Sequence, residues 1–490
     1  MLAGNGSSST RLKPPFRFAP GLKWFRSRFS NSRPRLDSPP TGLEAGLSVP
    51  AASEAQVTDR FVDTSSMDPS PIDSKASSLV SLVPVVQDTE SLISIDAHTG
   101  GHTATDKAIQ GGHTDTAQLR IENGTPVEAL DTKSYPLHLA ALNGHIDVVE
   151  LLLENGAPIE ATDQFKRAPL HLAAWHGHSA IVELLLEKGA LTEVVNLVNI
   201  TPLHLAAVSG HSDTVDLLIG SGAQIEALSK HNDTPLHLAA EGGHSSTVEL
   251  LLEKGALIEV VNKNNFTPLH LAAEGGHPDT VELLLRKGAQ IGALSKRNDT
   301  PLHLAAIGGH SGTVEILLEK GALIEGVNEN NNTPLHLAAE GGHSDTVELF
   351  LREGAQIDAI NKRNGTPLHL AAEGGHSGTV ELLLQKGALI EVVNEKNNTP
   401  LHLAARGGHS GTVELLLEKG ALIEVVNNNN NTPLHLAAVG GHSGTVELLL
   451  DKGALIEVVD KYNNTPLNIA AQEGYPDTVA LLLRKGAKFS

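Results

Sequence analysis

The sequence predicts an all-α solenoid in which a helix-turn-helix unit of 33 residues is repeated behind an irregular N-terminal region. Two observations predict this fold: a proline recurs every 33 residues, and the residues around each proline are nearly the same. Units with so strict a period bury their apolar faces against their neighbours, so they stack into one body. The repeated prolines are Pro136, Pro169, Pro202, Pro235, Pro268, Pro301, Pro334, Pro367, Pro400, Pro433 and Pro466.

The unit at residues 234–265 predicts two short helices and a finger. Thr234 can cap the first helix, and Pro235 is tolerated at the first helical position. The two glycines that follow Leu-Ala-Ala-Glu end this helix, because glycine reaches the left-handed conformation at little cost. The second helix carries an apolar stripe at helical spacing, formed by Val248, Leu251 and Leu252. The segment ALIEVVNKNN then predicts an extended finger with an Asn-rich turn.

The motif TPLHLAA recurs from Thr201 to Thr432, with the variants SYPLHLAA and RAPLHLAA before it and TPLNIAA after it. With two helices and a finger, this unit resembles the ankyrin repeat over residues 131–490. The resemblance implies eleven ankyrin repeats with β-hairpin fingers, which bind proteins on the concave face made by fingers and first helices. Two features depart from the family pattern. The finger stem GALIEVV or GAQIEAL is more apolar than the usual GADVNA, and the second variable site after Ala-Ala is mostly glycine.

The chain before residue 131 divides into three predicted parts. Residues 98–130 resemble one degenerate repeat, more polar than the others, which suits an N-terminal cap. Residues 37–97 are acidic and rich in Ser and Pro, which is typical of a linker. Residues 1–36 form a basic leader with eight Lys or Arg and no acid. The leader fits a disordered tail, a contact with an anionic membrane or an acidic partner, or a mitochondrial transit peptide, although its prolines argue against the last.

Composition favours a protein partner over other ligands. The formal net charge is −21 at pH 7, and residues 131–490 hold 24 Lys or Arg against 43 Asp or Glu, which argues against nucleic-acid binding. The absence of cysteine excludes disulfides and thiolate metal sites. No apolar run reaches the length of a membrane span, and no secretory signal is evident. We expect a monomer in the cytoplasm or nucleus, with mitochondrial targeting as an alternative.

Histidine forms two rows of ten, one at the TPLH position from His138 to His435 and one after glycine from His145 to His442. Repetition every 33 residues indicates a structural role, and the resemblance implies that the TPLH imidazole bonds near the threonine and links adjacent loops. No Asp, Glu or Cys joins the histidines at zinc-ligand spacing, so we expect no metal and no cofactor. A catalytic residue should occur once in a pocket, whereas nearly every polar residue here has a copy one repeat away. We therefore expect no enzyme activity.

An Asn-x-Thr sequence also repeats, from Asn199 to Asn463. In a secretory compartment it would be a glycosylation acceptor. Here the asparagine is more simply a turn residue and the threonine a helix cap, which favours an intracellular protein.

The resemblance places partner contacts at the fingertips and at the exposed end of the first helix, so departures from the repeat at these positions are the candidate binding residues. The apolar departures gather in the first units and predict a contact patch. The alternative is that Trp175 and Leu142 pack against fingers or the cap. Further along, the first-helix position is mainly acidic, which predicts a basic or polar partner. The candidates are Leu142, Phe165, Trp175, Leu197, Val198, Ile200, Val208, Glu241, Phe266, Glu274, Ile307, Glu340, Glu373 and Arg406.

The sequence thus predicts a non-enzymatic scaffold or adaptor that binds proteins along its concave face. A regulatory or receptor-like recognition module, acting on an enzyme or signalling partner on another chain, is the alternative. Membrane attachment through residues 1–36 is a further possibility.

Overall fold

The computed structural model describes residues 104–122 and 136–489, all within one unit, Ile93–Ser490. The predicted leader (1–36) and linker (37–97) lie outside the described residues, so the calls made on them stay predictions. The boundaries predicted for the cap and the repeats also stay predictions. Residues 104–122 do form a helical pair, which packs on the next pair, and the imidazole Nε2 of His145 donates to the carbonyl of Gln110 at 2.8 Å.

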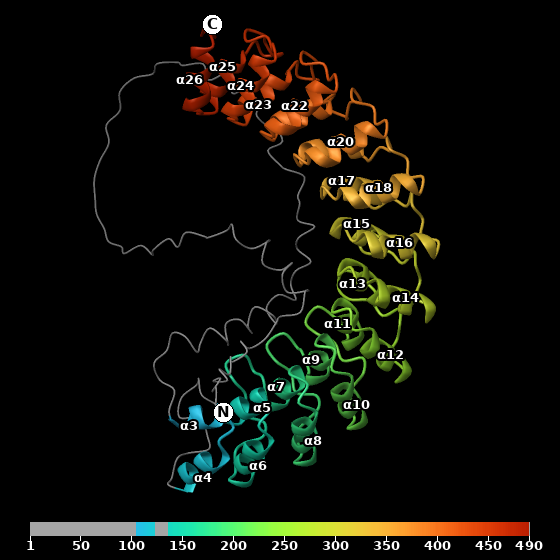
Figure 1. Cartoon of the computed structure of the whole chain (residues 1–490), viewed down its shortest axis with the longest axis vertical. Helices are drawn as coiled ribbons and strands as arrows, with labels where there is room; N and C mark the ends of the chain where they lie inside the picture. Colours follow the sequence, from blue (N-terminus) through green and yellow to red (C-terminus); the bar gives the residue numbers. More distant parts are fainter. Residues whose placement is uncertain (1–103, 123–135, 490) are drawn as a thin grey trace, which may run out of the picture. The chain divides into compact units, whose positions relative to one another are not determined.

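The described residues form pairs of short helices joined by tight turns (Figure 1). In this part of the chain, none of the helices is both long and apolar enough to cross a bilayer. The helices are α3 (Ala104–Gln110), α4 (Thr114–Glu122), α5 (Pro136–Asn143), α6 (Ile146–Glu154), α7 (Pro169–Trp175), α8 (Ser179–Glu187), α9 (Pro202–Val208), α10 (Ser212–Gly220), α11 (Pro235–Glu241), α12 (Ser245–Glu253), α13 (Pro268–Glu274), α14 (Pro278–Arg286), α15 (Pro301–Gly308), α16 (Ser311–Glu319), α17 (Pro334–Glu340), α18 (Ser344–Arg352), α19 (Pro367–Glu373), α20 (Ser377–Gln385), α21 (Pro400–Arg406), α22 (Ser410–Glu418), α23 (Pro433–Val439), α24 (Ser443–Asp451), α25 (Pro466–Gln472) and α26 (Pro476–Arg484).

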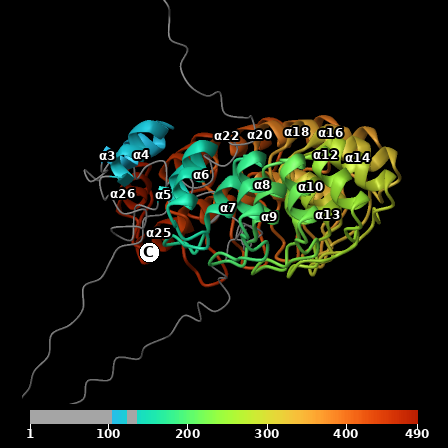
Figure 2. The same ribbon diagram turned by 90° about the horizontal axis from the view of Figure 1, so that it is seen from below.

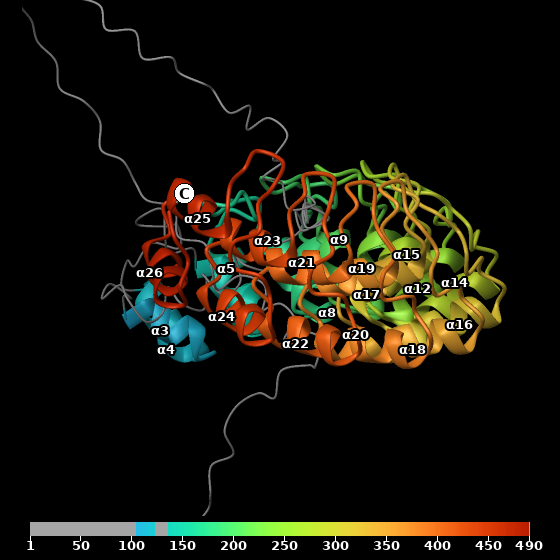
Figure 3. The same ribbon diagram turned by 90° about the horizontal axis from the view of Figure 1, so that it is seen from above.

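Successive pairs stack in chain order. Each first helix contacts the first helices of its neighbours, as α11 contacts α9 and α13, and the second helices do the same, as α14 contacts α16. The first helices line the inner side of the stack and the second helices its outer side (Figure 1). The loops of the fingers project together on one side of the helices (Figures 2 and 3). The fingers and the inner helices are therefore the two walls of the concave face.

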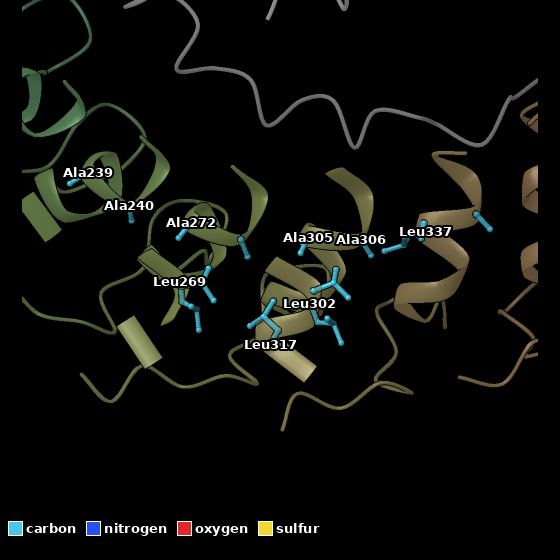
Figure 4. Packing of buried hydrophobic residues seen from close by; sticks show 14 of the residues in the cluster. Ala239, Ala240, Leu269, Ala272, Leu302, Ala305, Ala306, Leu317 and Leu337 are labelled. Atoms are coloured by element: carbon cyan, nitrogen blue, oxygen red, sulfur yellow. The ribbon is translucent and has the colours of Figure 1, made fainter. Parts of the chain in front are cut away.

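The first helix is short, capped and buried, as the sequence predicts. In α11 the hydroxyl of Thr234 accepts from the backbone N–H of His237, and Pro235 occupies the first turn. Leucine and alanine from successive first helices form a continuous core (Figure 4). Alanine at two positions lets these helices approach closely. Full burial of one leucine, such as Leu302, contributes roughly 2–3 kcal/mol.

The second helix buries a narrower face. Of its predicted stripe in α12, Val248 and Leu251 are buried, whereas Leu252 is only half-buried. Gly255 then adopts a left-handed φ of 98°, which ends the helix.

The fingers reverse the chain as predicted, but no described residue belongs to a β-strand. In one finger the backbone N–H of Asn262 donates to the carbonyl of Phe266 at 3.0 Å, and Asn265 turns the chain at a φ of 61°. A single further backbone bond, from Lys263 to the carbonyl of His231 at 2.9 Å, links this fingertip to the preceding one. One bond for each neighbour is too few for a strand ladder, so the fingers are hydrogen-bonded turns.

Candidate protein-binding surface

The residue that follows Ala-Ala ends each first helix and lies one repeat away from its counterpart. We call this set the ledge. Because successive first helices are in contact, ledge residues of neighbouring repeats lie side by side. Every member is half-buried, so each has side-chain surface available to a partner. The ledge consists of Leu142, Trp175, Val208, Glu241, Glu274, Ile307, Glu340, Glu373, Arg406 and Val439.

Histidines of the second row hold the backbone of the ledge. The Nε2 of His211 donates to the carbonyl of Trp175 at 3.1 Å, and that of His178 donates to Leu142 at 3.0 Å. The same bond recurs from His277 to Glu241 at 2.8 Å. The rings lie against glycines of the preceding repeat, as a Cβ on Gly243 would overlap the ring of His277. This overlap explains why the second variable site is followed by an invariant glycine along the stack.

The acidic part of the ledge has perturbed carboxylates. Burial, together with the nearby Glu274 carboxylate, raises the pKa of Glu241 to about 8. Burial and the neighbouring Glu373 raise the pKa of Glu340. Burial also raises the pKa of Glu373, against the lowering effect of nearby cations. A cationic group brought to this part of the ledge would restore the charged form of these carboxylates, so its binding would release protons.

The structure brings the early apolar candidates together on two neighbouring surfaces. Leu142, Trp175 and Val208 are consecutive ledge residues. Phe165 and Leu197 lie at consecutive fingertips, where the backbone N–H of Leu197 donates to the carbonyl of Phe165 at 3.2 Å.

The fingertip candidates differ in exposure. Leu197 is exposed, while Phe165 and Val198 are half-buried. The Arg167 guanidinium covers one face of the Phe165 ring, at 4.7 Å from its centroid. Nothing in these positions shows a bound partner, so their role in binding stays a prediction.

Two predicted contact residues are wrong. Ile200 is 1% exposed and Phe266 is 3% exposed, so neither can meet a partner. The residue before Thr-Pro lies under the finger of its own repeat, where its carbonyl accepts from a histidine of the previous repeat: His171 Nε2 donates to Ile200 at 3.0 Å. The Phe266 ring stacks on His270, with ring centroids 5.3 Å apart. This position is structural.

The sequence reasoning missed one set of exposed residues, which we call the stem stripe. It occupies the position just before the finger turn in nine successive fingers, and each member is aliphatic and 38–57% exposed. The members are Val195, Leu228, Val261, Leu294, Val327, Ile360, Val393, Val426 and Val459. The apolar stem was noticed in the sequence. The unbroken aliphatic identity at one fixed position is the signal that could have identified the stripe.

The TPLH histidines have the structural role that the resemblance implies. In one repeat the Nδ1 of His204 accepts from the backbone N–H of Thr201 at 3.2 Å, and its Nε2 donates to the carbonyl of Asp233 in the next finger at 3.0 Å. Across residues 104–122 and 136–489, no group of three or more His, Asp or Glu side chains could hold a metal ion. The repeated asparagines from Asn199 to Asn463 adopt the left-handed φ that a turn residue needs.

Comparison with known proteins agrees with this architecture. A family model for ankyrin repeats, spanning three copies, matches residues 87–196, 137–229, 203–295, 288–361, 342–427 and 422–490. Among solved structures, the ankyrin repeat domain of human ASB11 is similar, with 31% sequence identity and a TM-score of 0.42, over 46% of this chain and 99% of that one. A search of curated proteins found no match. Ankyrin repeats are in general protein–protein interaction modules. Because the family model covers most of its length, the chain belongs to the ankyrin-repeat family.

Proposed function

We propose that this protein is a non-enzymatic scaffold or adaptor that binds partner proteins on the concave face of its stack, in the cytoplasm or nucleus. One observation carries the proposal: Leu142, Trp175 and Val208 are consecutive on the ledge, apolar, and only half-buried. Apolar surface that includes a tryptophan is a common centre of protein interfaces. The backbone under it is held by histidines of the next repeat, so the patch is preorganised.

The ledge changes character along the stack, and so should the partner. Apolar side chains of a partner would meet Leu142, Trp175 and Val208. Basic or polar side chains would meet the acidic positions from Glu241 to Glu373, where like charges already raise the pKa of Glu241.

Catalysis by the chain itself is not part of this proposal. Its histidines are occupied by hydrogen bonds to threonines and backbone carbonyls, and each has a copy one repeat away. A turnover that the purified chain alone performs would contradict this.

The experiment is a pull-down from cells with four proteins: the full chain, residues 98–490, the pair Leu142→Ala and Trp175→Ala, and the matched pair Ile307→Ala and Val439→Ala. The matched pair removes apolar ledge side chains from other repeats. We expect partners to be lost with the first pair and kept with the second. If the first pair leaves every partner bound, the early ledge is not the binding site. Partners lost only on truncation would place recognition in the leader.

A further inference from the structure

The stem stripe is an unbroken apolar surface that the early ledge does not include. Its members recur in every finger from Val195 to Val459 and remain 38–57% exposed within the stack. A second set of exposed leucines, such as Leu257, Leu323 and Leu389, lies elsewhere. The equivalent Leu191 lines a groove with residues of α8 and α10 on the second helices. That leucine set is interrupted by Gln224, Gln290 and Gln356, whereas the stem stripe is not.

Charges of opposite sign flank the stem stripe. In the fingers from the third to the tenth repeat, the two central turn positions hold eight Lys or Arg and two Glu, although the whole chain carries a net charge of −21. The basic residues are exposed, and they are Lys230, Lys263, Lys296, Arg297, Lys362, Arg363, Lys396 and Lys461. The other wall is the acidic ledge. The two walls face each other closely enough for Arg363 and Lys396 to lower the pKa of Glu373.

The spacing of the stripe selects the shape of its occupant. Neighbouring packed helices lie about 8–10 Å apart, so successive stripe residues recur at about that distance. Seven residues of an α-helix advance about 10.5 Å and return to the same face. Two residues of a β-strand, which also return to the same face, advance only about 6.6 Å. One apolar residue per heptad therefore matches one stripe residue per repeat.

We propose that the stem stripe binds an amphipathic α-helix of a partner protein, with apolar residues at heptad spacing and acidic residues on the flank that faces the basic fingertips. This rests on the proposed function, in that the stack binds proteins on its concave face, and it adds the chemistry of one partner. Burial of aliphatic side chains on both sides supplies affinity, and the fingertips orient the helix.

The test uses synthetic peptides and the full chain, with binding followed by fluorescence anisotropy. The first peptide has four heptads with leucine at heptad spacing, glutamate on one flank and glutamine elsewhere. The second has the same composition in scrambled order, and the third carries lysine in place of glutamate. A fourth, rich in proline with leucine at every third residue, has a similar pitch of about 9.3 Å in an extended left-handed helix. We expect the first peptide to bind tightest. Equal binding of the scrambled peptide, or tighter binding of the lysine or proline-rich peptide, overturns the proposal.

Matched variants then locate the site. Leu294→Ser, Val327→Ser and Ile360→Ser together remove three consecutive stripe residues and should weaken the first peptide at least about tenfold. Leu257→Ser, Leu323→Ser and Leu389→Ser remove as many exposed leucines from the other set and should leave binding unchanged. Far-UV circular dichroism checks that both proteins fold. An unchanged affinity in the stripe variant, or an equal loss in the control, overturns the proposal.

A fingertip variant tests the charge requirement. Lys296→Glu together with Lys362→Glu should weaken the glutamate peptide and strengthen the lysine peptide. The reverse order contradicts the assigned flank. The pair Leu142→Ala and Trp175→Ala should still bind the glutamate peptide. If no variant binds any peptide while that pair still loses its cellular partners, the stripe proposal fails and the proposed function stands.

Discussion

At the scale of single residues, a hydroxyl ladder joins the second helices, and one step of it is broken. In most repeats a buried threonine bonds to a serine of the previous repeat, as Ser311 Oγ does to Thr346 Oγ1 at 2.9 Å. Pro278 stands where that serine would be for Thr313. The hydroxyl of Thr313 is consequently buried with no hydrogen-bond partner. An unpaired buried hydroxyl costs free energy that valine would not.

We therefore predict that Thr313→Val raises the free energy of unfolding by about 1 kcal/mol, because it removes a polar group that gains nothing in the folded state. Thr346→Val makes the same change where the hydroxyl is bonded and should lower the free energy of unfolding by about 1 kcal/mol. Urea denaturation of both variants measures the difference. Equal effects in the two variants would show that the missing serine partner is irrelevant to stability.

The same scale shows how far single positions could be assigned from the sequence. The Asn-x-Thr pattern predicts a turn residue followed by a cap, and both are found, since each depends on its own finger. Ile200 and Phe266 were assigned to the surface because they vary between repeats. Whether such a side chain is buried depends on the fold of the finger over it, which the pattern of one unit does not contain.

At the scale of one finger, an asparagine at the start of the turn serves two fingers at once. Asn427 Oδ1 accepts from the backbone N–H groups of Asn429 and Asn431, and its Nδ2 donates to Asn398 Oδ1 in the previous finger at 2.8 Å. Asp460 takes this place in the next finger and has no N–H to donate. The Oδ1 of Asn431 is accordingly buried without a partner.

We predict that Asp460→Asn stabilises this finger by about 1 kcal/mol, because the new amide can donate to Asn431 Oδ1 while its own Oδ1 still accepts from Tyr462 and Asn464. Hydrogen exchange of the backbone amides in the finger should slow. Asn427→Asp is the matched control, and it should speed exchange in its own finger by removing the bond to Asn398. Faster exchange in Asp460→Asn would contradict this account of the finger contact.

At the scale of the whole molecule, the TPLH histidines join every repeat to the next and are neutral when folded. Burial lowers the pKa of His204, His336 and His402 to about 4. In each, Nδ1 accepts from the threonine N–H and Nε2 donates to the next finger. Neither nitrogen can take a further proton without losing a bond. His171, His270 and His369 have their pKa lowered to about 4 in the same way.

The sign of the pH dependence follows from these values. The folded pKa of about 4 lies below the unfolded value of about 6.5, so the unfolded chain binds more protons between these limits. The contribution of each histidine is complete above pH 6.5 and is lost as the pH falls through that window, by roughly 3 kcal/mol for a fully buried ring. Six such rings exceed the usual stability of a domain.

We predict that the stack loses its helices cooperatively between pH 6.5 and 4, and regains them when neutral pH is restored. Far-UV circular dichroism across a pH titration measures this loss. Glu241 has the opposite sign, since its pKa is raised to about 8, and Glu241→Gln should raise the melting temperature at pH 8.5 but not at pH 5. Full helicity at pH 4 would show that the buried histidines do not control stability.

The sequence by itself determined the period, the two helices of each unit, their caps, the asparagine turns and the structural role of both histidine rows. These features depend on residues within one unit or on repetition between identical units, both of which a single chain displays. Only the tertiary structure decided which positions are exposed, that the fingers hold no strand ladder, and that histidines fix the ledge from the next repeat. Burial and cross-repeat hydrogen bonds arise when one unit is placed against another, so the same residue type at one position is core or surface according to its neighbour.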